Sequence, residues 1–206
     1  MLFDCLSIFS LLTILLLLKR LVNIYPSLIA CLIRSKECLN LDSSVKLARD
    51  RNMLTLAMML PFCLTACRFR LYDISFFKDM DTDTVLGMYC AVFAAYVILR
   101  RMTTRLFRPK RIPSTTWSAA DTASFNFFII LTLTLLATGG ILDILNISDT
   151  VASYAMLWES GIIYILFLWR KLQILTSNCS VFTAFLYLCA LEMIPTGILI
   201  VPDIIF

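Results

Sequence analysis

Long apolar runs, separated by short charged or turn-forming stretches, dominate the chain from beginning to end. A helix needs about 20 mostly apolar residues to cross the roughly 30 Å hydrocarbon layer of a bilayer. Six runs approach that length, at about residues 2–18, 52–71, 84–99, 119–142, 148–169 and 179–201. The pattern therefore predicts an all-α membrane protein. We expect a bundle of six transmembrane helices that forms a single integral membrane domain over residues 1–206.

The apolar segment 21–33 does not fit this pattern. Its thirteen residues are too few to cross a bilayer, and Asn23 and Pro26 interrupt them. A crossing here would also place one of the two basic pairs that flank the segment on the wrong side of the membrane. We therefore predict one interfacial helix between the first and second spans.

The basic side chains are distributed unevenly between the connections. Fifteen of the eighteen lysines and arginines follow the first, third and fifth runs, and eight of the fourteen acidic residues belong to the other side. Because cytoplasmic loops carry an excess of basic residues, this asymmetry predicts that both termini face away from the cytoplasm. The first run has no basic residue before it, so we expect a retained span rather than a cleaved secretion signal.

Composition supports the membrane assignment and excludes several kinds of chemistry. Hydrophobic residues make up 60% of the chain, charged residues make up 16%, and histidine is absent. The lack of histidine excludes histidine-based metal sites and Ser-His-Asp or Cys-His catalysis, and we predict no catalytic residue, no metal and no cofactor. The net charge of +4 belongs to the loops and does not indicate nucleic-acid binding. The eight cysteines are expected to be reduced and to pack as small apolar groups.

Two acidic residues lie deep inside predicted spans, Glu159 near the middle of the fifth and Glu192 beyond the middle of the sixth. An ionisable group at this depth is expensive and is by default a candidate for function. The short connection between these spans makes them antiparallel neighbours, so the two carboxyl groups can meet if both face inward. One interpretation is a site for a proton or a cationic substrate. The other is a protonated Glu192 bonded to a backbone carbonyl freed by Pro195, since neither acid has an obvious basic partner inside the membrane.

Small residues and a cap mark two other spans. Gly87, Ala91 and Ala95 recur every four residues and form a helix-packing seam on one face of the third span. Such seams let helices approach closely in lipid, so this one packs either within the bundle or between two copies of the chain. At the start of the fourth span, Asp121 is expected to stabilise the positive N-terminal end of the helix.

Two stretches of the chain have a distinctive sequence. They are Lys-Leu-Ala-Arg-Asp-Arg-Asn at 46–52 and Phe-Leu-Tyr-Leu-Cys-Ala-Leu-Glu-Met-Ile-Pro at 185–195. Together with the layout of the spans, they resemble an uncharacterised family of polytopic inner-membrane proteins from Bacteroidota, a domain of unknown function of about this length. The resemblance implies a bacterial inner membrane with a periplasm outside, and it implies no activity. The chain departs from that family at 201–206, where a basic residue is expected after the last span.

These observations predict an uncharacterised polytopic inner-membrane protein that acts as a non-enzymatic accessory or scaffold subunit of a membrane complex. The alternative is a small proton-coupled transporter that uses Glu159 and Glu192. The expected partners are the lipid bilayer and either other membrane proteins or a second copy of the chain.

Overall fold

The structure is a computed structural model, and it describes residues 2–34, 37–38, 44–71, 81–106 and 113–197. Its main helices are α1 (Leu2–Ile33), α3 (Val45–Arg68), α4 (Thr82–Leu106), α5 (Ser114–Ile144), α6 (Asp149–Thr176) and α7 (Val181–Leu188). A π-helical turn, η2 (Cys189–Met193), continues α7. The described ranges contain no strand, so the all-α prediction is confirmed for them.

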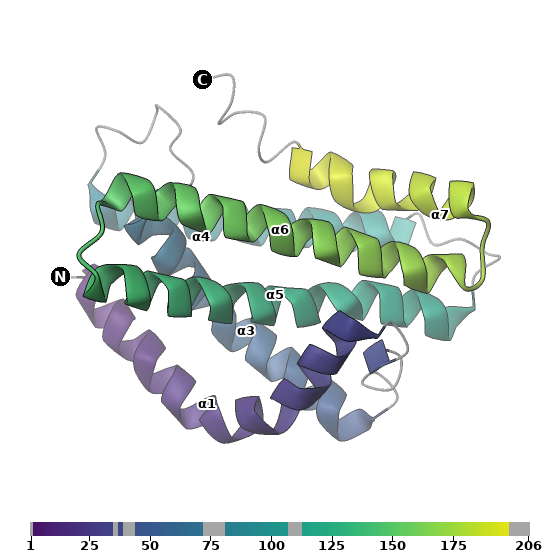
Figure 1. The fold of residues 1–206 in the computed structure, drawn as a ribbon, viewed down its shortest axis with the longest axis horizontal. Coiled ribbons are helices and arrows are strands. Elements are labelled where there is room, and N and C mark those ends of the chain that lie inside the picture. The colour runs from purple at the N-terminus through teal and green to yellow at the C-terminus, as the bar shows by residue number, and fades with distance from the viewer. Residues whose placement is uncertain (1, 35–36, 39–43, 72–80, 107–112, 198–206) are drawn as a thin grey trace.

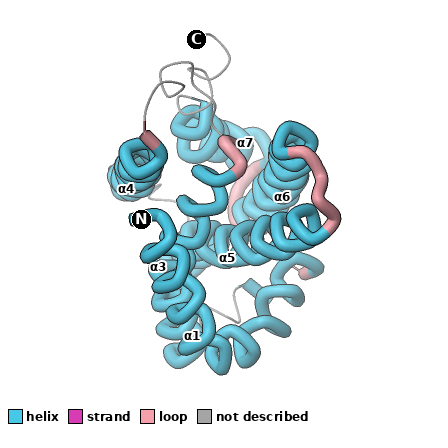
Figure 2. Tube along the Cα trace, turned by 90° about the vertical axis from the view of Figure 1, so that its left-hand side faces the viewer, coloured by secondary structure: helices cyan, strands magenta, loops and turns pink. Residues whose placement is uncertain are grey.

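Helix α5 occupies the centre of the bundle (Figure 1). It packs against α6, α3 and α1, while α4 lies at one side of the molecule and α6 at the other (Figure 2). In the most apolar part of α5, 28% of the residues are buried, compared with 6% in α1 and in α4. Helices α4, α5 and α6 run lengthwise in alternating directions, so the C-terminal ends of α4 and α6 meet the N-terminal ends of α5 and α7.

Four of the described helices are long and apolar enough to cross a membrane. They are Phe3–Ile33, Thr82–Leu106, Thr116–Ile144 and Asp149–Thr176. By the length and composition of its helices, the chain is therefore suited to a multi-pass membrane protein.

The prediction of six spans is wrong. Helix α3 is not among the four because Arg51, Asn52 and Arg68 lower its mean hydropathy, and it packs against α1, α4 and α5. The last apolar helix, Val181–Gly197, is shorter than the four spans. Residues 198–201 of the sixth predicted span lie outside the described residues.

The segment 21–33 is not a separate interfacial helix, which corrects a second prediction. Helix α1 is continuous to Ile33, and it bends sharply in its second half (Figure 1). Pro26 lies in this half and cannot donate the backbone hydrogen bond of a helix interior, which accounts for the bend. One face of the segment packs against other helices, where Ile24 and Leu28 are fully buried, while Val22 and Ile33 on the other face are 63% and 64% exposed.

Cys31 and Cys38 form a disulfide at the C-terminal end of α1. Both residues are buried in a core cluster with side chains of α5, α6 and α7. Asn126 of α5 donates a hydrogen bond from its side-chain amide to Cys31 Sγ at 3.6 Å. The expectation of reduced cysteines is therefore wrong for this pair, while the other six cysteines are free.

Gly139 lies where α5 meets α6 and the end of α3. A Cβ atom there would lie 2.9 Å from Met156 Cε and 3.1 Å from Phe69 Cε2, whereas a Cβ at Gly140 would meet nothing within 4 Å. Since Met156 is fully buried, we expect Gly139→Val to lower the free energy of unfolding by about 1–3 kcal/mol through overpacking. Gly140→Val is the matched control. Thermal unfolding of both variants in detergent measures the difference, and equal midpoints would contradict this packing.

Candidate functional site

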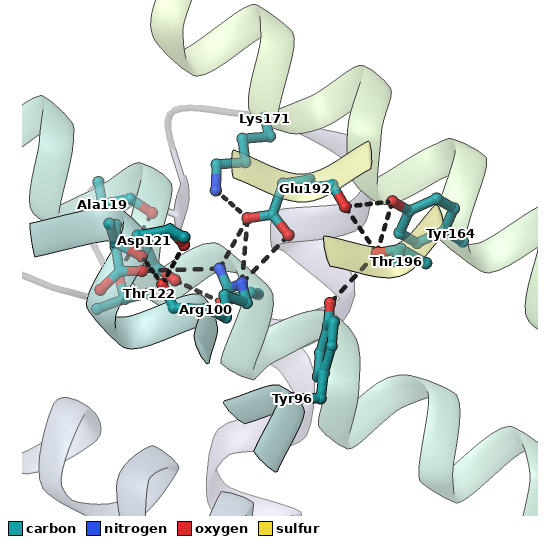
Figure 3. A network of polar contacts seen from close by, with 12 residues as sticks. Tyr96, Arg100, Ala119, Asp121, Thr122, Tyr164, Lys171, Glu192 and Thr196 are labelled. Carbon is teal, nitrogen blue, oxygen red and sulfur yellow. Dashed lines mark hydrogen bonds and ion pairs between the residues drawn. The ribbon is translucent and has the colours of Figure 1, made fainter. Parts of the chain in front are cut away.

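Glu192 lies buried where α4, α6 and the C-terminal helix meet, with a relative exposure of 2%. Arg100 of α4 donates to its carboxylate twice, from Nε to Oε2 at 3.1 Å and from Nη2 to Oε1 at 2.9 Å. Lys171 of α6, which is equally buried, donates from Nζ to Oε1. Figure 3 shows the carboxylate held between these two cationic side chains. One acidic group therefore connects three helices.

Asp121 of α5 balances the charge of this group. Its Oδ1 lies 3.6 Å from Arg100 Nη2. With all four side chains ionised, two positive charges face two negative ones, which offsets the cost of burying each charge alone. Helix α5 begins seven residues before Asp121, at Ser114, so the prediction that Asp121 stabilises the helix N-terminus is wrong.

The backbone at Glu192 departs from the α-helix. The N–H of Ile194 donates to the carbonyl of Cys189, five residues earlier, which is the π-helical pattern. Pro195 follows directly and has no N–H to donate, so a regular α-helical ladder would lose a bond at this point. The Pro195 ring thus leaves the carbonyl of Leu191 without its α-helical donor. Separately, two hydroxyl groups donate to the Glu192 carbonyl oxygen, from Thr196 at 2.7 Å and from Tyr164 at 3.3 Å. π-helical turns of this kind are frequent at functional sites.

Two tyrosines extend the polar contacts from the flanking helices. The Tyr164 hydroxyl of α6 donates to Thr196 Oγ1 at 3.1 Å, and the Tyr96 hydroxyl of α4 lies 3.4 Å from the same oxygen. We call these residues the Glu192 cluster, which consists of Tyr96, Arg100, Asp121, Tyr164, Lys171, Glu192 and Thr196. The cluster positions charged and hydroxyl groups from four helices around one turn of backbone (Figure 3).

The structure does not bring Glu159 to Glu192. Glu159 lies twelve residues before Lys171 on the continuous helix α6, which is about 18 Å along the helix axis. Its side chain is half-buried, and its Oε2 is buried without a hydrogen-bond partner among the described residues. The two acids that the sequence singles out therefore occupy different environments, one with an unpaired oxygen and one enclosed by cations.

The carboxyl of Glu192 also has different partners from those expected. Its oxygens accept from Arg100 and Lys171, so the interpretation of a carboxyl bonded to a freed carbonyl does not match these contacts. The sequence analysis missed both basic residues because it assigned them to the connections outside the spans. One feature of the sequence links these two basic residues to the site. Each follows a tyrosine of the cluster on the same helix, Arg100 one turn after Tyr96 and Lys171 about two turns after Tyr164.

Gly87, Ala91 and Ala95 are all exposed on α4. A Cβ atom built at Gly87 would meet nothing within 4 Å. The opposite side of α4 packs against the protein, where Leu86 is buried and Phe93 is partly buried. The structure therefore does not use the seam for packing within the described bundle.

Comparisons of the chain with protein family models, with curated proteins and with solved structures find no match. Within the described ranges, no group of three or more potential metal-ligating side chains comes together. What the Glu192 cluster can do chemically therefore follows from its own geometry. It neutralises buried charge and fixes the relative positions of α4, α6 and the C-terminal helix.

The charges of the cluster should be coupled in their effect on stability. Glu192→Gln leaves Lys171 and Arg100 facing each other without the carboxylate between them, and we expect a loss of about 3 kcal/mol or more. Adding Lys171→Met should recover much of that loss, because Arg100 keeps its contact with Asp121. Glu159→Gln, which removes an acid with no described ionic partner, is the control and should change little. Thermal unfolding of the wild type, Glu192→Gln, Lys171→Met and the double variant completes the cycle, and strictly additive losses would show that the charges act separately.

Proposed function

We propose that the chain is a polytopic protein of a bacterial inner membrane that acts as a non-enzymatic accessory or scaffold subunit of a membrane complex. The observation that carries this proposal is the enclosed carboxylate of Glu192. Arg100 and Lys171 neutralise it from inside the protein, so it requires no substrate to balance its charge. Buried ions arranged in this way join helices to one another, which is the property of a structural subunit.

The orientation in the membrane is part of this proposal. Four helices are apolar and long enough to cross. Basic residues gather at or just after the C-terminal ends of α4 and α6, whereas the α5–α6 connection contains none. We therefore assign the end of the bundle that contains the C-terminal ends of α4 and α6 to the cytoplasm. The resemblance of residues 185–195 to a Bacteroidota inner-membrane family supports a bacterial inner membrane.

The outward seam of α4 supports a role in assembly. Because Gly87, Ala91 and Ala95 are exposed, the backbone of α4 is accessible to close approach by another helix. In lipid, helices associate through small residues of this kind rather than through a water-driven effect. The partner is a helix of another membrane protein or of a second copy of this chain.

A bulky side chain on the seam should disrupt this association without unfolding the protein. We expect Ala91→Leu to reduce partner recovery several-fold, because the added side chain keeps the helices apart. Ala155→Leu makes the same change at an exposed position of another spanning helix and is the control. Affinity purification in mild detergent measures the effect. Quantitative mass spectrometry detects other co-purifying proteins, and a second copy of the chain with a different tag detects self-association. Equal recovery with Ala91→Leu and with Ala155→Leu would argue against the seam as an assembly surface.

One observation favours a second candidate, the proton-coupled transporter. Oε2 of Glu159 is buried without a described hydrogen-bond partner, and an unsatisfied carboxyl oxygen within a spanning helix can accept a proton or a cation. Glu192 suits this role less well, because its oxygens already accept from Arg100 and Lys171.

Glu159→Gln separates the two candidate functions. In proteoliposomes with an imposed pH gradient, a scaffold shows the same proton flux for the wild type and for the variant, which is the result we expect. The flux is followed with a pH-sensitive dye inside the vesicles. A proton flux that the wild type carries and Glu159→Gln abolishes would favour the transporter.

A further inference from the structure

A cavity of about 470 Å³ lies between the C-terminal part of α4 and the N-terminal part of α5. It is lined by Arg101, Thr104, Arg105, Trp117, Asp121 and Phe125. Its lining therefore combines cationic, hydroxyl and aromatic side chains. The cavity adjoins the Glu192 cluster through Asp121 but is lined mainly by residues outside it.

The cavity carries a net positive charge. Arg101 and Arg105 are both exposed, and no described carboxylate forms an ion pair with either of them. Arg101 lies over the ring of Phe125, 6.0 Å from its centroid. The one acidic lining residue, Asp121, already faces Arg100. Two guanidinium groups are therefore available to an anion.

The surface next to the cavity is apolar. Ile98, Met102 and Leu106 of α4 are 60%, 57% and 75% exposed. Together with Arg101 and Arg105 they lie on the outer side of the same helix, about one turn apart. A ligand that reaches both surfaces needs an anionic group and a hydrocarbon chain.

We propose that this cavity binds an anionic phospholipid of the surrounding bilayer. Arg101 and Arg105 bind the phosphate, since guanidinium groups match phosphate oxygens in charge and geometry. The acyl chains lie along Ile98 and Met102. The cavity lies at the end of the bundle that we assign to the cytoplasm, where basic side chains attract anionic lipids. This lipid site does not depend on the scaffold role proposed above.

The test uses Trp117, which lines the cavity, as a fluorescent reporter. Trp158→Phe and Trp169→Phe remove the other two tryptophans of the chain, and both positions are exposed. The protein is reconstituted in two bilayers, both of phosphatidylglycerol and phosphatidylcholine. In the first bilayer phosphatidylglycerol carries brominated acyl chains, which quench tryptophan fluorescence, and in the second phosphatidylcholine carries them. The ratio of Trp117 quenching in the two bilayers gives the lipid preference at the cavity. We expect a preference for phosphatidylglycerol of about five-fold or more, since each basic side chain contributes roughly that factor.

Paired charge variants identify the ligands. Arg101→Gln with Arg105→Gln should bring the preference close to one. Lys19→Gln with Arg68→Gln removes the same charge from exposed positions elsewhere and should leave the preference unchanged. No preference in the parent protein, or an equal loss in both double variants, would overturn the assignment.

Two further measurements keep the result unambiguous. If inorganic phosphate at millimolar concentration abolishes the preference, the cavity takes a free anion and the lipid assignment fails. If the double glutamine variant does not fold, Arg101→Lys with Arg105→Lys and a salt series on the parent protein replace it. The preference must then persist with lysine and fall with rising salt, and a preference insensitive to salt would contradict the proposal.

Discussion

The ionic contact of Glu192 with Arg100 and Lys171 determines how the C-terminal part of this protein can be arranged. A carboxylate that is 2% exposed can remain ionised only if positive charge reaches it. The two cations come from α4 and α6, so both helices must stay within side-chain reach of the same backbone turn. A further contact from α6 reaches the same turn, because the Tyr164 hydroxyl donates to the carbonyl oxygen of Glu192.

Helix α4 is attached to the bundle by two different kinds of interaction. Near its middle, the ring of Phe93 contacts Phe62 of α3 and Phe128 of α5, with centroids 5.1 Å and 5.2 Å apart. Nearer its C-terminal end, Arg100 provides the ionic contacts. Aromatic packing is adaptable in direction, whereas the guanidinium must meet its carboxylate at hydrogen-bonding distance. The ionic end therefore sets the axial position of α4, and the aromatic contact adds apolar attachment.

Apolar runs predicted the helical class and the general positions of the spanning helices, but they did not predict where the helices end. The sequence analysis ended three spans at the basic pairs that begin at Lys19, Arg100 and Arg170, while the helices continue to Ile33, Leu106 and Thr176. Hydropathy counts each basic residue as a cost, but Arg100 and Lys171 meet a carboxylate on another helix, which offsets that cost. Such pairing is a long-range property, and Arg100 and Glu192 are 92 residues apart. For the same reason, the sequence identified Glu192 as unusual but not its partners.

The disulfide between Cys31 and Cys38 has a consequence for its own redox stability. Its two sulfur atoms belong to a buried core cluster with side chains of α5, α6 and α7. Thiol–disulfide exchange needs an attacking thiolate to reach a sulfur atom, so these packed helices shield the bond. Thiols on the cytoplasmic side of a membrane are normally kept reduced, and a disulfide at the end of the bundle assigned to the cytoplasm persists only while this packing keeps reductants out.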